Sequence, residues 1–435
     1  MGRCVGLGMR SDVNRSTDER PRRVLLADRD PRTLQASFLA LISKPIDIIL
    51  IDPATPELEV TRIVDWLKPD QILVTGSPSL GDPTNADNSP VNLAVVPKVG
   101  KILIPTGGTT GRPGFAVHTW KTLYAAAAGF CRAFPGPAHT FCILPLWHVG
   151  GLMQLIRALI TKARFELEDW PSVETGAARP RLEGSFLSLV PTQLRRLLED
   201  PAGAGWLRQF RAIFLGGAAA WPPLLEYARE ERIPLAPAYG MTETAAQVCC
   251  LRPDEFLCGR SGVGRALPHA RLSVVDEKSR PLAACKVGRI RIESESLFLG
   301  YSGELSRRGS GYVTSDLGSI DHNGFVTIMG RSDNMINTGG EKVIPAEVEA
   351  AIWDVGLVDD VAVYGRSDPE WGETICALFV SDRFPGEIEA RRRLKPVLAP
   401  QKIPRHWIQV KELPRNALGK LDRRRARDLI EVKDD

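Results

Sequence analysis

Residues 101–114 read KILIPTGGTTGRPG, a short apolar run that leads directly into a loop rich in glycine and threonine. The apolar run predicts a buried strand from Lys101 to Pro105. Glycines let a backbone approach an anion and present N–H donors, while threonine hydroxyls add donors for phosphate oxygens. The loop lacks the Gly-Lys-Ser/Thr ending of a Walker loop, which disfavours a kinase or GTPase. A phosphate-binding loop is therefore indicated, with a purely structural glycine-rich turn as the alternative.

Similar strands surround this loop and alternate with helices. Before it, IDIILI (Ile46 to Ile51) and QILVT (Gln71 to Thr75) read as buried strands. After it, the Ala-rich stretch from Trp120 to Phe134 predicts a helix. Further strands are predicted at 140–144, 186–190 and 212–215, and further helices at 192–199 and 221–231. This alternation is typical of an α/β protein with a largely parallel sheet.

The pattern changes after about Arg260. Short strands separated by turns, at 271–275, 288–292 and 325–329, predict a β-rich subdomain. The rest predicts a compact α+β unit with helices at 346–353 and 387–398, strands at 361–364, 375–380 and 407–410, and a polar tail. We therefore expect a large N-terminal domain over residues 1–330 and a small C-terminal domain over residues 331–435, with residues 1–25 poorly ordered.

Composition narrows the class of protein. The 435 residues are 43% hydrophobic and 25% charged, which fits a globular chain with a sizeable core. The formal net charge of +4 is too weak to indicate a nucleic-acid partner. No apolar run reaches the roughly 18 residues of a membrane span, and no secretory signal is recognisable. The eight cysteines show no CxxC spacing, so we expect a cytoplasmic protein with reduced thiols. The sequence does not report the oligomeric state, and a homodimer remains open.

Three further motifs carry side chains suited to a nucleotide. Tyr239-Gly-Met-Thr-Glu243 offers a ring that can stack on a purine, a hydroxyl for a phosphate oxygen and a carboxylate for Mg²⁺. Asp316, and later the Arg331-Ser-Asp333 stretch, offer a carboxylate for ribose hydroxyls and a guanidinium. Lys420, in NALGK, could reach a cleft as a point charge. Taken singly, these motifs also fit a structural loop, a surface ion pair and a solvated lysine.

The order of these motifs resembles the adenylate-forming superfamily of acyl-CoA synthetases, peptide-synthetase adenylation domains and luciferases. The resemblance covers roughly residues 70–425. It implies an enzyme that uses ATP and Mg²⁺ to convert a carboxylic acid to an acyl-adenylate, and then transfers the acyl group to coenzyme A. It also implies that the large domain holds ATP and acid, while a mobile C-terminal domain rotates between the two half-reactions.

The resemblance further implies a role for each motif residue. The phosphates of ATP would contact the loop residues Thr106, Gly107, Gly108, Thr109, Thr110 and Gly111. The rest of the ATP site would comprise Gly216, Gly217, Ala218, Tyr239, Gly240, Met241, Asp316 and Arg331, with Tyr239 stacking on adenine and Asp316 holding the ribose. Thr242 would contact phosphate, Glu243 would bind Mg²⁺ and Lys420 would stabilise charge during adenylation. Asp333 would be the hinge, and Gly339 and Gly340 would face the acyl site during thioester formation.

Within the superfamily, four stretches are similar to the o-succinylbenzoate–CoA ligases of menaquinone and phylloquinone synthesis. They are LPLWHVGGL (144–152), SLVPTQLRRLL (188–198), LGGAAAW (215–221) and YGMTETAAQV (239–248). HTW at 118–120 resembles the photosynthetic branch of these ligases. The implied acid pocket consists of His148, Ser188, Thr192 and Gly240, with His148 gating or lining it as a catalytic residue.

The sequence leaves two points open: which cation recognises the acid, and how tightly the phosphate loop binds phosphate. Arg195, Arg196 or another cation would meet the second carboxylate of the substrate. The phosphate loop has Gly108 where most relatives carry serine or threonine, and Gly114 where many carry lysine. Backbone N–H groups must therefore supply more of the phosphate contacts.

Three other functions also remain open. The chain could be a CoA ligase for another aryl or fatty acid. It could be a non-catalytic acyl-adenylate-binding protein, although Glu243, Asp316 and Lys420 argue against this. It could be an adenylation domain that feeds a carrier protein, which the absence of a carrier module disfavours.

Overall fold

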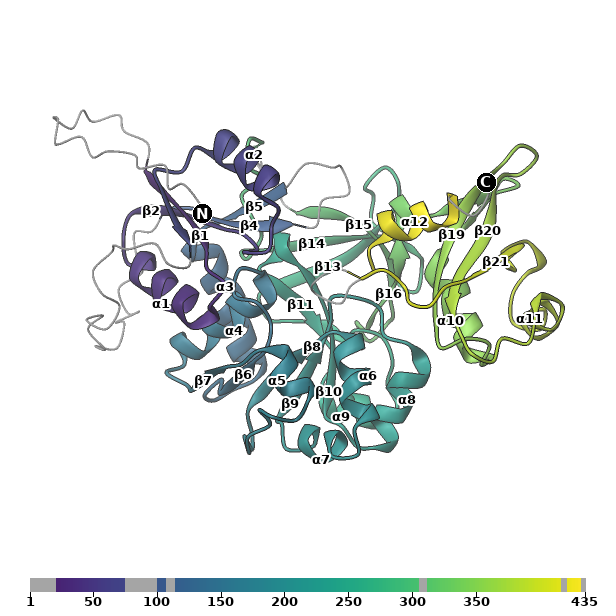
Figure 1. Cartoon of the computed structure of the whole chain (residues 1–435), viewed down its shortest axis with the longest axis horizontal. Coiled ribbons are helices and arrows are strands. Elements are labelled where there is room, and N and C mark those ends of the chain that lie inside the picture. The colour runs from purple at the N-terminus through teal and green to yellow at the C-terminus, as the bar shows by residue number, and fades with distance from the viewer. Residues whose placement is uncertain (1–20, 75–99, 107–113, 305–310, 416–420, 432–435) are drawn as a thin grey trace, which may run out of the picture.

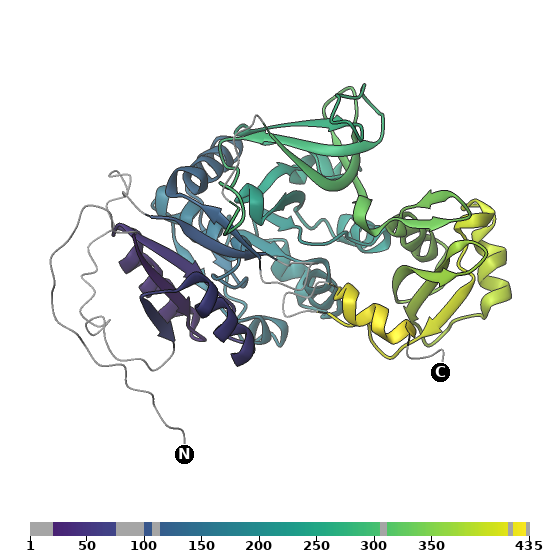
Figure 2. The same cartoon turned by 90° about the horizontal axis from the view of Figure 1, so that it is seen from above.

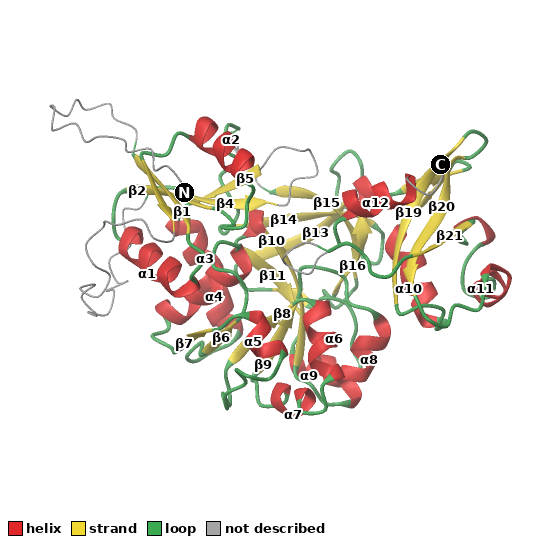
Figure 3. Ribbon diagram, in the orientation of Figure 1, coloured by secondary structure: helices red, strands yellow, loops and turns green. Residues whose placement is uncertain are grey.

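The computed structural model describes residues 21–74, 100–106, 114–304, 311–415 and 421–431. Figure 1 shows a large body that holds most of the chain, with a smaller body at one end that contains the C-terminal residues. Strands and helices mix throughout both bodies (Figure 3). The α/β class expected from the sequence is confirmed.

The first sheet has five strands in the order β3-β1-β2-β4-β5, parallel except for the β4–β5 pair. They are β1 (Arg22–Ala27), β2 (Ile46–Leu50), β3 (Gln71–Val74), β4 (Ile102–Thr106) and β5 (Gly114–His118). Helices α1 (Pro31–Ile42) and α2 (Glu57–Leu67) connect the first three strands. The carboxylate of Asp30 caps α1 by accepting the N–H groups of Arg32 and Thr33.

Strand β1 corrects one expectation. Residues 1–25 were expected to be poorly ordered, but β1 begins at Arg22 and lies between β2 and β3. Its side chains Val24, Leu25 and Leu26 are buried because both flanking strands and the covering helices pack around them. Residues 1–20 lie outside the described part of the chain.

The second sheet has seven strands in the order β12-β11-β10-β9-β8-β6-β7. They are β6 (Thr140–Cys142), β7 (Phe165–Leu167), β8 (Phe186–Leu189), β9 (Ala212–Leu215), β10 (Leu235–Met241), β11 (Ala246–Cys250) and β12 (Arg265–Ala266). The strands from β6 to β10 run parallel, whereas β11 and β12 pair antiparallel. The C-terminal end of β10 therefore shares one edge with the ends of β8 and β9, where the predicted site residues lie.

Helices cover both faces of this second sheet. They are α3 (Trp120–Ala133), α4 (Val149–Ile160), α5 (Trp170–Glu174), α6 (Pro191–Glu199), α7 (Gly203–Leu207), α8 (Pro222–Glu230) and α9 (Pro253–Leu257). α3 and α4 pack between the two sheets, since Leu123 and Met153 share a core with Ile48 of β2. On the side of the second sheet, Phe130 of α3 contacts Phe186 and Phe214 edge to face. α6, α7 and α8 share a core with β8 and β9.

The third sheet confirms the β-rich subdomain. Its four antiparallel strands are β13 (Ala270–Val275), β14 (Gly288–Ser294), β15 (Tyr312–Ile320) and β16 (Val326–Arg331). Figure 2 shows this sheet as a separate layer beside the first two.

The fourth sheet forms the small body. Its strands β17 (Ile336–Thr338), β18 (Glu341–Val343), β19 (Asp360–Asp368), β20 (Gly372–Val380) and β21 (His406–Gln409) pack with α10 (Pro345–Asp354), α11 (Glu387–Leu394) and α12 (Arg423–Glu431). α11 ends earlier than predicted, shortly before Pro396, which cannot continue a helix. α12 occupies the expected polar tail, with Ala426 buried against the sheet. The rings of Trp221 and Trp353 meet at 5.7 Å and join the small body to α8.

No helix within the described residues is long and apolar enough to cross a membrane.

Candidate active site

The stretch from Tyr239 to Glu243 lies where β10 ends. Gly240 and Met241 are its last residues, and Thr242 opens a single 3₁₀ turn that contains Glu243. Gly240 pairs with Gln247 of β11, and a Cβ at this position would lie 2.1 Å from the carbonyl oxygen of Ala246. Only glycine fits there, because any side chain would push the two strands apart.

Tyr239 and Asp316 meet across the second and third sheets. The Tyr239 hydroxyl donates a hydrogen bond of 2.6 Å to Oδ2 of Asp316, and both side chains are buried. Burial raises the pKa of Asp316, although the Tyr239 hydrogen bond opposes this shift. Burial, together with the charge of Asp316, raises the pKa of Tyr239, so the phenol stays protonated and can donate. The structure thus brings together two residues predicted to hold the adenosine.

Arg331 extends this contact toward the small body. Its Nη1 atom lies 3.9 Å from Oδ1 of Asp316, and its Nε atom donates to Oδ1 of Asp333 at 2.8 Å. The hydrogen bond to Arg331 is the main cause that lowers the pKa of Asp333. Arg331 and Asp333 expose 45% and 41% of their side chains, so this ion pair lies at the surface. Three predicted residues therefore form one chain, Asp316–Arg331–Asp333, across the predicted domain boundary.

Thr242 and Glu243 are fixed by groups outside their own motif. His118, at the end of β5, lies with Nε2 2.7 Å from the carbonyl oxygen of Thr242 and with Nδ1 2.9 Å from the Thr122 hydroxyl. A carbonyl can only accept, so Nε2 carries the proton. His118 is fully buried, and burial lowers its pKa to about 4. Oε1 of Glu243 accepts a hydrogen bond of 2.6 Å from the hydroxyl of Tyr301.

The described residues include only the two ends of the phosphate loop. Thr106 ends β4 and pairs with Gly114 at the start of β5. Gly107, Gly108, Thr109, Thr110 and Gly111 lie outside the described residues, as does Lys420. A Cβ at Gly114 would lie 2.6 Å from the Thr106 hydroxyl, so the glycine leaves room for that hydroxyl.

The predicted acid-pocket residues are spread along the edge of the second sheet. His148 caps α4, with Nδ1 accepting the N–H of Gly150 at 3.1 Å. Ser188 lies on β8, Thr192 is the second residue of α6, and Gly216, Gly217 and Ala218 follow β9. The N–H of Gly216 donates to Leu189 at 3.2 Å, which ties this loop to β8, and Gly217 adopts a φ of +82° that favours glycine.

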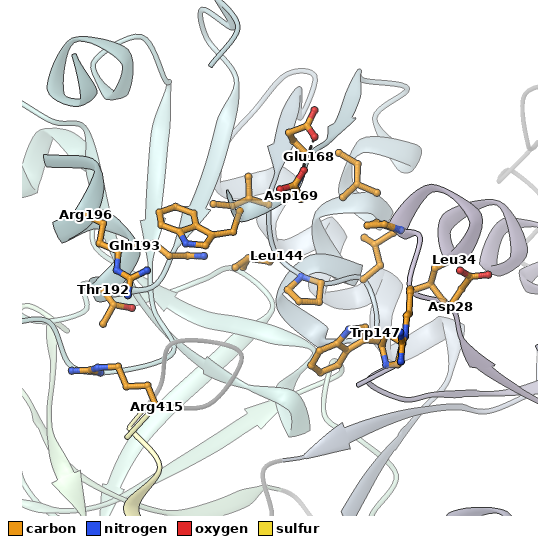
Figure 4. Close-up of a pocket in the computed structure, with 18 residues that line it drawn as sticks. Asp28, Leu34, Leu144, Trp147, Glu168, Asp169, Thr192, Gln193, Arg196 and Arg415 are labelled. Atoms are coloured by element: carbon orange, nitrogen blue, oxygen red, sulfur yellow. Dashed lines mark hydrogen bonds between the residues drawn. The ribbon is translucent and has the colours of Figure 1, made fainter. Parts of the chain in front are cut away.

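A cavity of about 430 Å³ opens beside these residues. It is lined by Leu144, Trp147, Trp170, Thr192, Arg196 and Arg415, among others. Figure 4 shows Thr192, Arg196 and Arg415 on one side and Trp147 on the other. Thr192 lines this cavity, whereas His148, Ser188 and Gly240 do not.

Sequence reasoning missed one buried cation, Arg157 of α4. The side chain is 4% exposed, and no carboxylate among the described residues forms an ion pair with it. Its Nη2 atom donates to Oε1 of Gln247 at 2.9 Å, and its guanidinium lies 4.2 Å from the ring centroid of Phe130. Burial lowers its pKa to about 10. Its partner Gln247 pairs with Gly240, one of the predicted acid-pocket residues, across the β10–β11 ladder. A single charge within an apolar helix was the signal that could have revealed it.

Arg195 and Arg196, the two cations considered from the sequence, differ from Arg157 in burial and in partners. Nε of Arg195 lies 3.5 Å from Glu199, and Nη1 of Arg196 lies 2.8 Å from Glu174. Their side chains are 41% and 51% exposed. Both already have a carboxylate partner, unlike Arg157.

Gly339 and Gly340 form the turn between β17 and β18 in the small body. Both have positive φ angles, +57° and +84°, which favour glycine. A Cβ on Gly339 would lie 2.7 Å from the ring of Trp371, whose carbonyl accepts the Gly339 N–H at 2.9 Å. The two glycines thus allow a tight turn against Trp371.

Comparison with known proteins now decides the family. The pattern of the AMP-binding enzyme family matches residues 19–302, and that of the AMP-binding enzyme C-terminal domain matches residues 347–420. The chain belongs to the AMP-binding enzyme family. As members of it, 2-succinylbenzoate–CoA ligases of Geobacillus kaustophilus and Listeria monocytogenes are 32% and 31% identical to this chain. The alignments cover 75% and 74% of this chain and 68% of each relative.

Solved structures share the fold of this AMP-binding enzyme. One is the o-succinylbenzoate–CoA synthetase of Bacillus subtilis in complex with its acyl-adenylate intermediate, with a TM-score of 0.77 and 23% identity over 94% of this chain and 88% of that chain. Another is the ATP-bound MatB of Rhodopseudomonas palustris, with a TM-score of 0.79 and 22% identity over 95% of this chain and 90% of that chain. These likenesses confirm the architecture of a large N-terminal part and a small C-terminal part.

Proposed function

We propose that this AMP-binding enzyme activates 2-succinylbenzoate with ATP and transfers the acyl group to coenzyme A. The observation that carries the proposal is the hydrogen bond between Tyr239 and Asp316, with Glu243 in the turn that directly follows β10, in a chain 32% identical to a 2-succinylbenzoate–CoA ligase. The product, succinylbenzoyl-CoA, would serve menaquinone or phylloquinone synthesis. We place the enzyme in the cytoplasm, and a homodimer is the assembly to test first by light scattering.

Two balanced half-reactions make up the proposed activity. In the first, a carboxylate oxygen of the acid attacks the α-phosphorus of ATP, and pyrophosphate leaves with the electrons of the broken P–O bond. In the second, the sulfur of coenzyme A attacks the acyl carbon, AMP leaves and the thiol proton passes to solvent. Lys420 would stabilise the charge that develops in the first step, and His148 would line or gate the acyl group.

Different residues of the proposed nucleotide site would bind different parts of ATP. The phosphate loop from Thr106 to Gly111 would hold the phosphates together with Thr242. Gly216, Gly217, Ala218, Gly240 and Met241 would border adenine and the acid, Tyr239 would contact the adenine, and Asp316 would hold the ribose with Arg331 nearby. Asp316 suits this role because its carboxylate is held in place by the Tyr239 hydroxyl at 2.6 Å.

Glu243 fits the requirements of Mg²⁺. Among the described residues, no three His, Cys, Asp or Glu side chains lie close enough together to hold a metal ion by themselves. Mg²⁺ is commonly held by one or two carboxylates together with substrate phosphates, which a single glutamate beside a nucleotide site can provide. When bound, the ion would neutralise charge on the phosphoryl oxygens.

The second carboxylate of the acid needs a cation, and Arg157 is the best candidate. It is buried, it lacks a carboxylate partner among the described residues, and Gln247 links it to Gly240. A buried charge without a counter-ion is costly, and an acidic ligand would supply that counter-ion. Ser188 and Thr192 would complete the acid pocket.

The same cleft would serve both half-reactions if residues 331–435 rotate relative to residues 1–330. Asp333 would be the hinge, and Gly339 and Gly340 would approach the acyl group in the second pose. Such a rotation would keep water from a hydrolysable acyl-adenylate.

A panel of acids tests the proposal. Purified enzyme with ATP, Mg²⁺ and coenzyme A should release pyrophosphate faster with 2-succinylbenzoate than with benzoate or a medium-chain fatty acid. Equal rates with all acids would favour a ligase for another aryl or fatty acid. Pyrophosphate release without transfer to coenzyme A would favour an adenylation domain that feeds a carrier protein. Binding of an acyl-adenylate analogue without any pyrophosphate release would indicate a non-catalytic binding protein.

A further inference from the structure

The segment that follows β14 ties the phosphate-loop hairpin to Glu243. The N–H of Leu299 donates to Val117 of β5, and the N–H of Val117 donates to Gly300. Beside these bonds, the N–H of Phe298 donates to the backbone carbonyl of Glu243 at 2.9 Å. The segment therefore fixes both the strand that leaves the phosphate loop and the turn that carries the predicted metal ligand.

Tyr301 lies at the end of this segment and reaches the Glu243 side chain. Its hydroxyl donates to Oε1 at 2.6 Å, and its ring packs against Phe298 with centroids 5.0 Å apart. Its backbone also bridges to Ala116 of β5. A phenol carries a proton to donate and a carboxylate can only accept, so the Tyr301 hydroxyl is the donor in this contact.

This hydrogen bond makes the two oxygens of the carboxylate unequal. Oε1 is engaged by Tyr301, whereas Oε2 accepts no hydrogen bond from any residue in the described part of the chain. A metal ion that approaches Glu243 therefore meets one free oxygen. Ca²⁺ readily accepts both oxygens of a carboxylate, while Mg²⁺ requires a near-ideal octahedron of single oxygens.

We infer that Tyr301 is a positioning residue that holds Glu243 as a one-oxygen ligand and so favours Mg²⁺ over Ca²⁺ at the nucleotide site. The inference rests on the proposed function, because that function assigns the metal to Glu243. Groups that orient a metal ligand typically change metal affinity by about 10- to 100-fold when they are removed.

A purely structural role for Tyr301 predicts a different outcome. In that case the ring would matter and the hydroxyl would not, since the ring fills the space beside Phe298. The substitution Tyr301→Phe keeps the ring and removes only the oxygen atom, so it separates the two roles with little risk to folding.

Tyr364→Phe is the matched control. Tyr364 is a buried tyrosine of β19, and its hydroxyl has no hydrogen-bond partner within the described residues. It belongs to the small body, where it packs with Leu378 and Ala426 rather than with any predicted ATP contact. Loss of its hydroxyl removes the same atom without touching Glu243.

The test measures metal binding directly and then activity. The thermal shift produced by ATP is recorded against increasing Mg²⁺, Mn²⁺ or Ca²⁺ in the absence of acid and coenzyme A. We expect Tyr301→Phe to raise the Mg²⁺ concentration for half of the shift by about 10-fold or more, with a smaller change for Ca²⁺, and Tyr364→Phe to match the wild type. Acid-dependent pyrophosphate release should show the same change in Mg²⁺ requirement.

Two results distinguish the failure of this inference from the failure of the proposed function. Superimposable metal titrations for Tyr301→Phe and the wild type, in an enzyme that does release pyrophosphate, would overturn the role of Tyr301 alone. Absence of acid-dependent pyrophosphate release from the wild type would overturn the proposed function. An equal loss for all three metals in Tyr301→Phe, matched by a lower melting temperature without metal, would assign Tyr301 a structural role.

Discussion

Replacing Arg157 with methionine should weaken the binding of the acid substrate but change the stability of the fold only slightly. The pKa of Arg157 falls from 12.5 to about 10, which corresponds to roughly 3 kcal/mol spent on keeping the buried guanidinium charged. Against this stand a charged hydrogen bond to Gln247, worth about 1.5–3 kcal/mol, and stacking on Phe130, worth up to about 2 kcal/mol. These contributions nearly cancel, and methionine fills a similar volume. We expect the melting temperature to change by no more than about 3 °C.

Binding of the acid should respond much more strongly. A charge-assisted contact with a carboxylate contributes about 1.5–3 kcal/mol, so its loss raises KM for 2-succinylbenzoate by roughly 10- to 150-fold. KM for ATP and for a monocarboxylic acid such as benzoate should change little. Steady-state kinetics with each substrate varied in turn, combined with thermal melting of the same samples, checks both halves of the prediction.

Arg211→Met provides the matched control. Arg211 also stacks on a phenylalanine, at 5.0 Å from the Phe186 ring, and donates to a backbone carbonyl at 2.9 Å, but it is exposed and touches none of the predicted site residues. Its loss should leave KM for the acid unchanged. The reasoning is refuted if Arg157→Met keeps a normal KM for 2-succinylbenzoate, or if its KM for benzoate rises by the same factor.

Three further predictions concern the reaction and its pH dependence. Lys420→Ala should abolish acid-dependent pyrophosphate release but spare transfer from preformed acyl-adenylate to coenzyme A; equal loss of both half-reactions, measured separately, would contradict the assigned role. Asp333→Pro should keep adenylation and block thioester formation, because proline fixes φ at the hinge; full ligation, followed by thioester absorbance, would disprove this. Burial lowers the pKa of His118 from 6.5 to about 4. Between these two pH values the unfolded chain binds a proton that the folded chain does not, so the free energy of unfolding decreases as the pH falls from 6.5 to about 4. His118→Gln should therefore reduce the loss in free energy of unfolding between pH 7.5 and 4.5 by up to roughly 3 kcal/mol, as measured by urea denaturation; an unchanged slope would argue against the buried neutral imidazole.

The sequence predicted the elements whose hydrophobic pattern is unambiguous. Strand β9 has the predicted bounds, Ala212–Leu215, and α3 differs by one residue at its end. These segments were clear because each is a continuous apolar run or an Ala-rich stretch between turn residues. Helix α4 was not predicted, and its first turn contains Gly150 and Gly151, which have a low helix propensity. Gly151 is nevertheless required there, because the carbonyl oxygen of Pro145 lies 2.3 Å from where its Cβ would be.

The candidate site was only partly accessible to sequence reasoning. The motifs that hold Tyr239, Glu243 and Asp316 were found because each has a local signature. Tyr301 and His118 were not assigned to Glu243 and Thr242, since these contacts join residues 58 and 124 positions apart and depend on how three sheets pack. Arg157 was overlooked for the same reason, because its partner Gln247 is 90 positions away.

The contact between Arg331 and Asp316 has a consequence for the pace of catalysis, because it crosses the proposed boundary between the two parts. The two charges lie 3.9 Å apart and the Arg331 side chain is 45% exposed, so the pair contributes at most about 1 kcal/mol, which is comparable with thermal energy. A contact this weak can break and form spontaneously, so a rotation of the C-terminal part would need no chemical energy beyond that released by each half-reaction. Salt, which screens such a pair, should therefore alter the balance between the two poses rather than the chemistry in either of them.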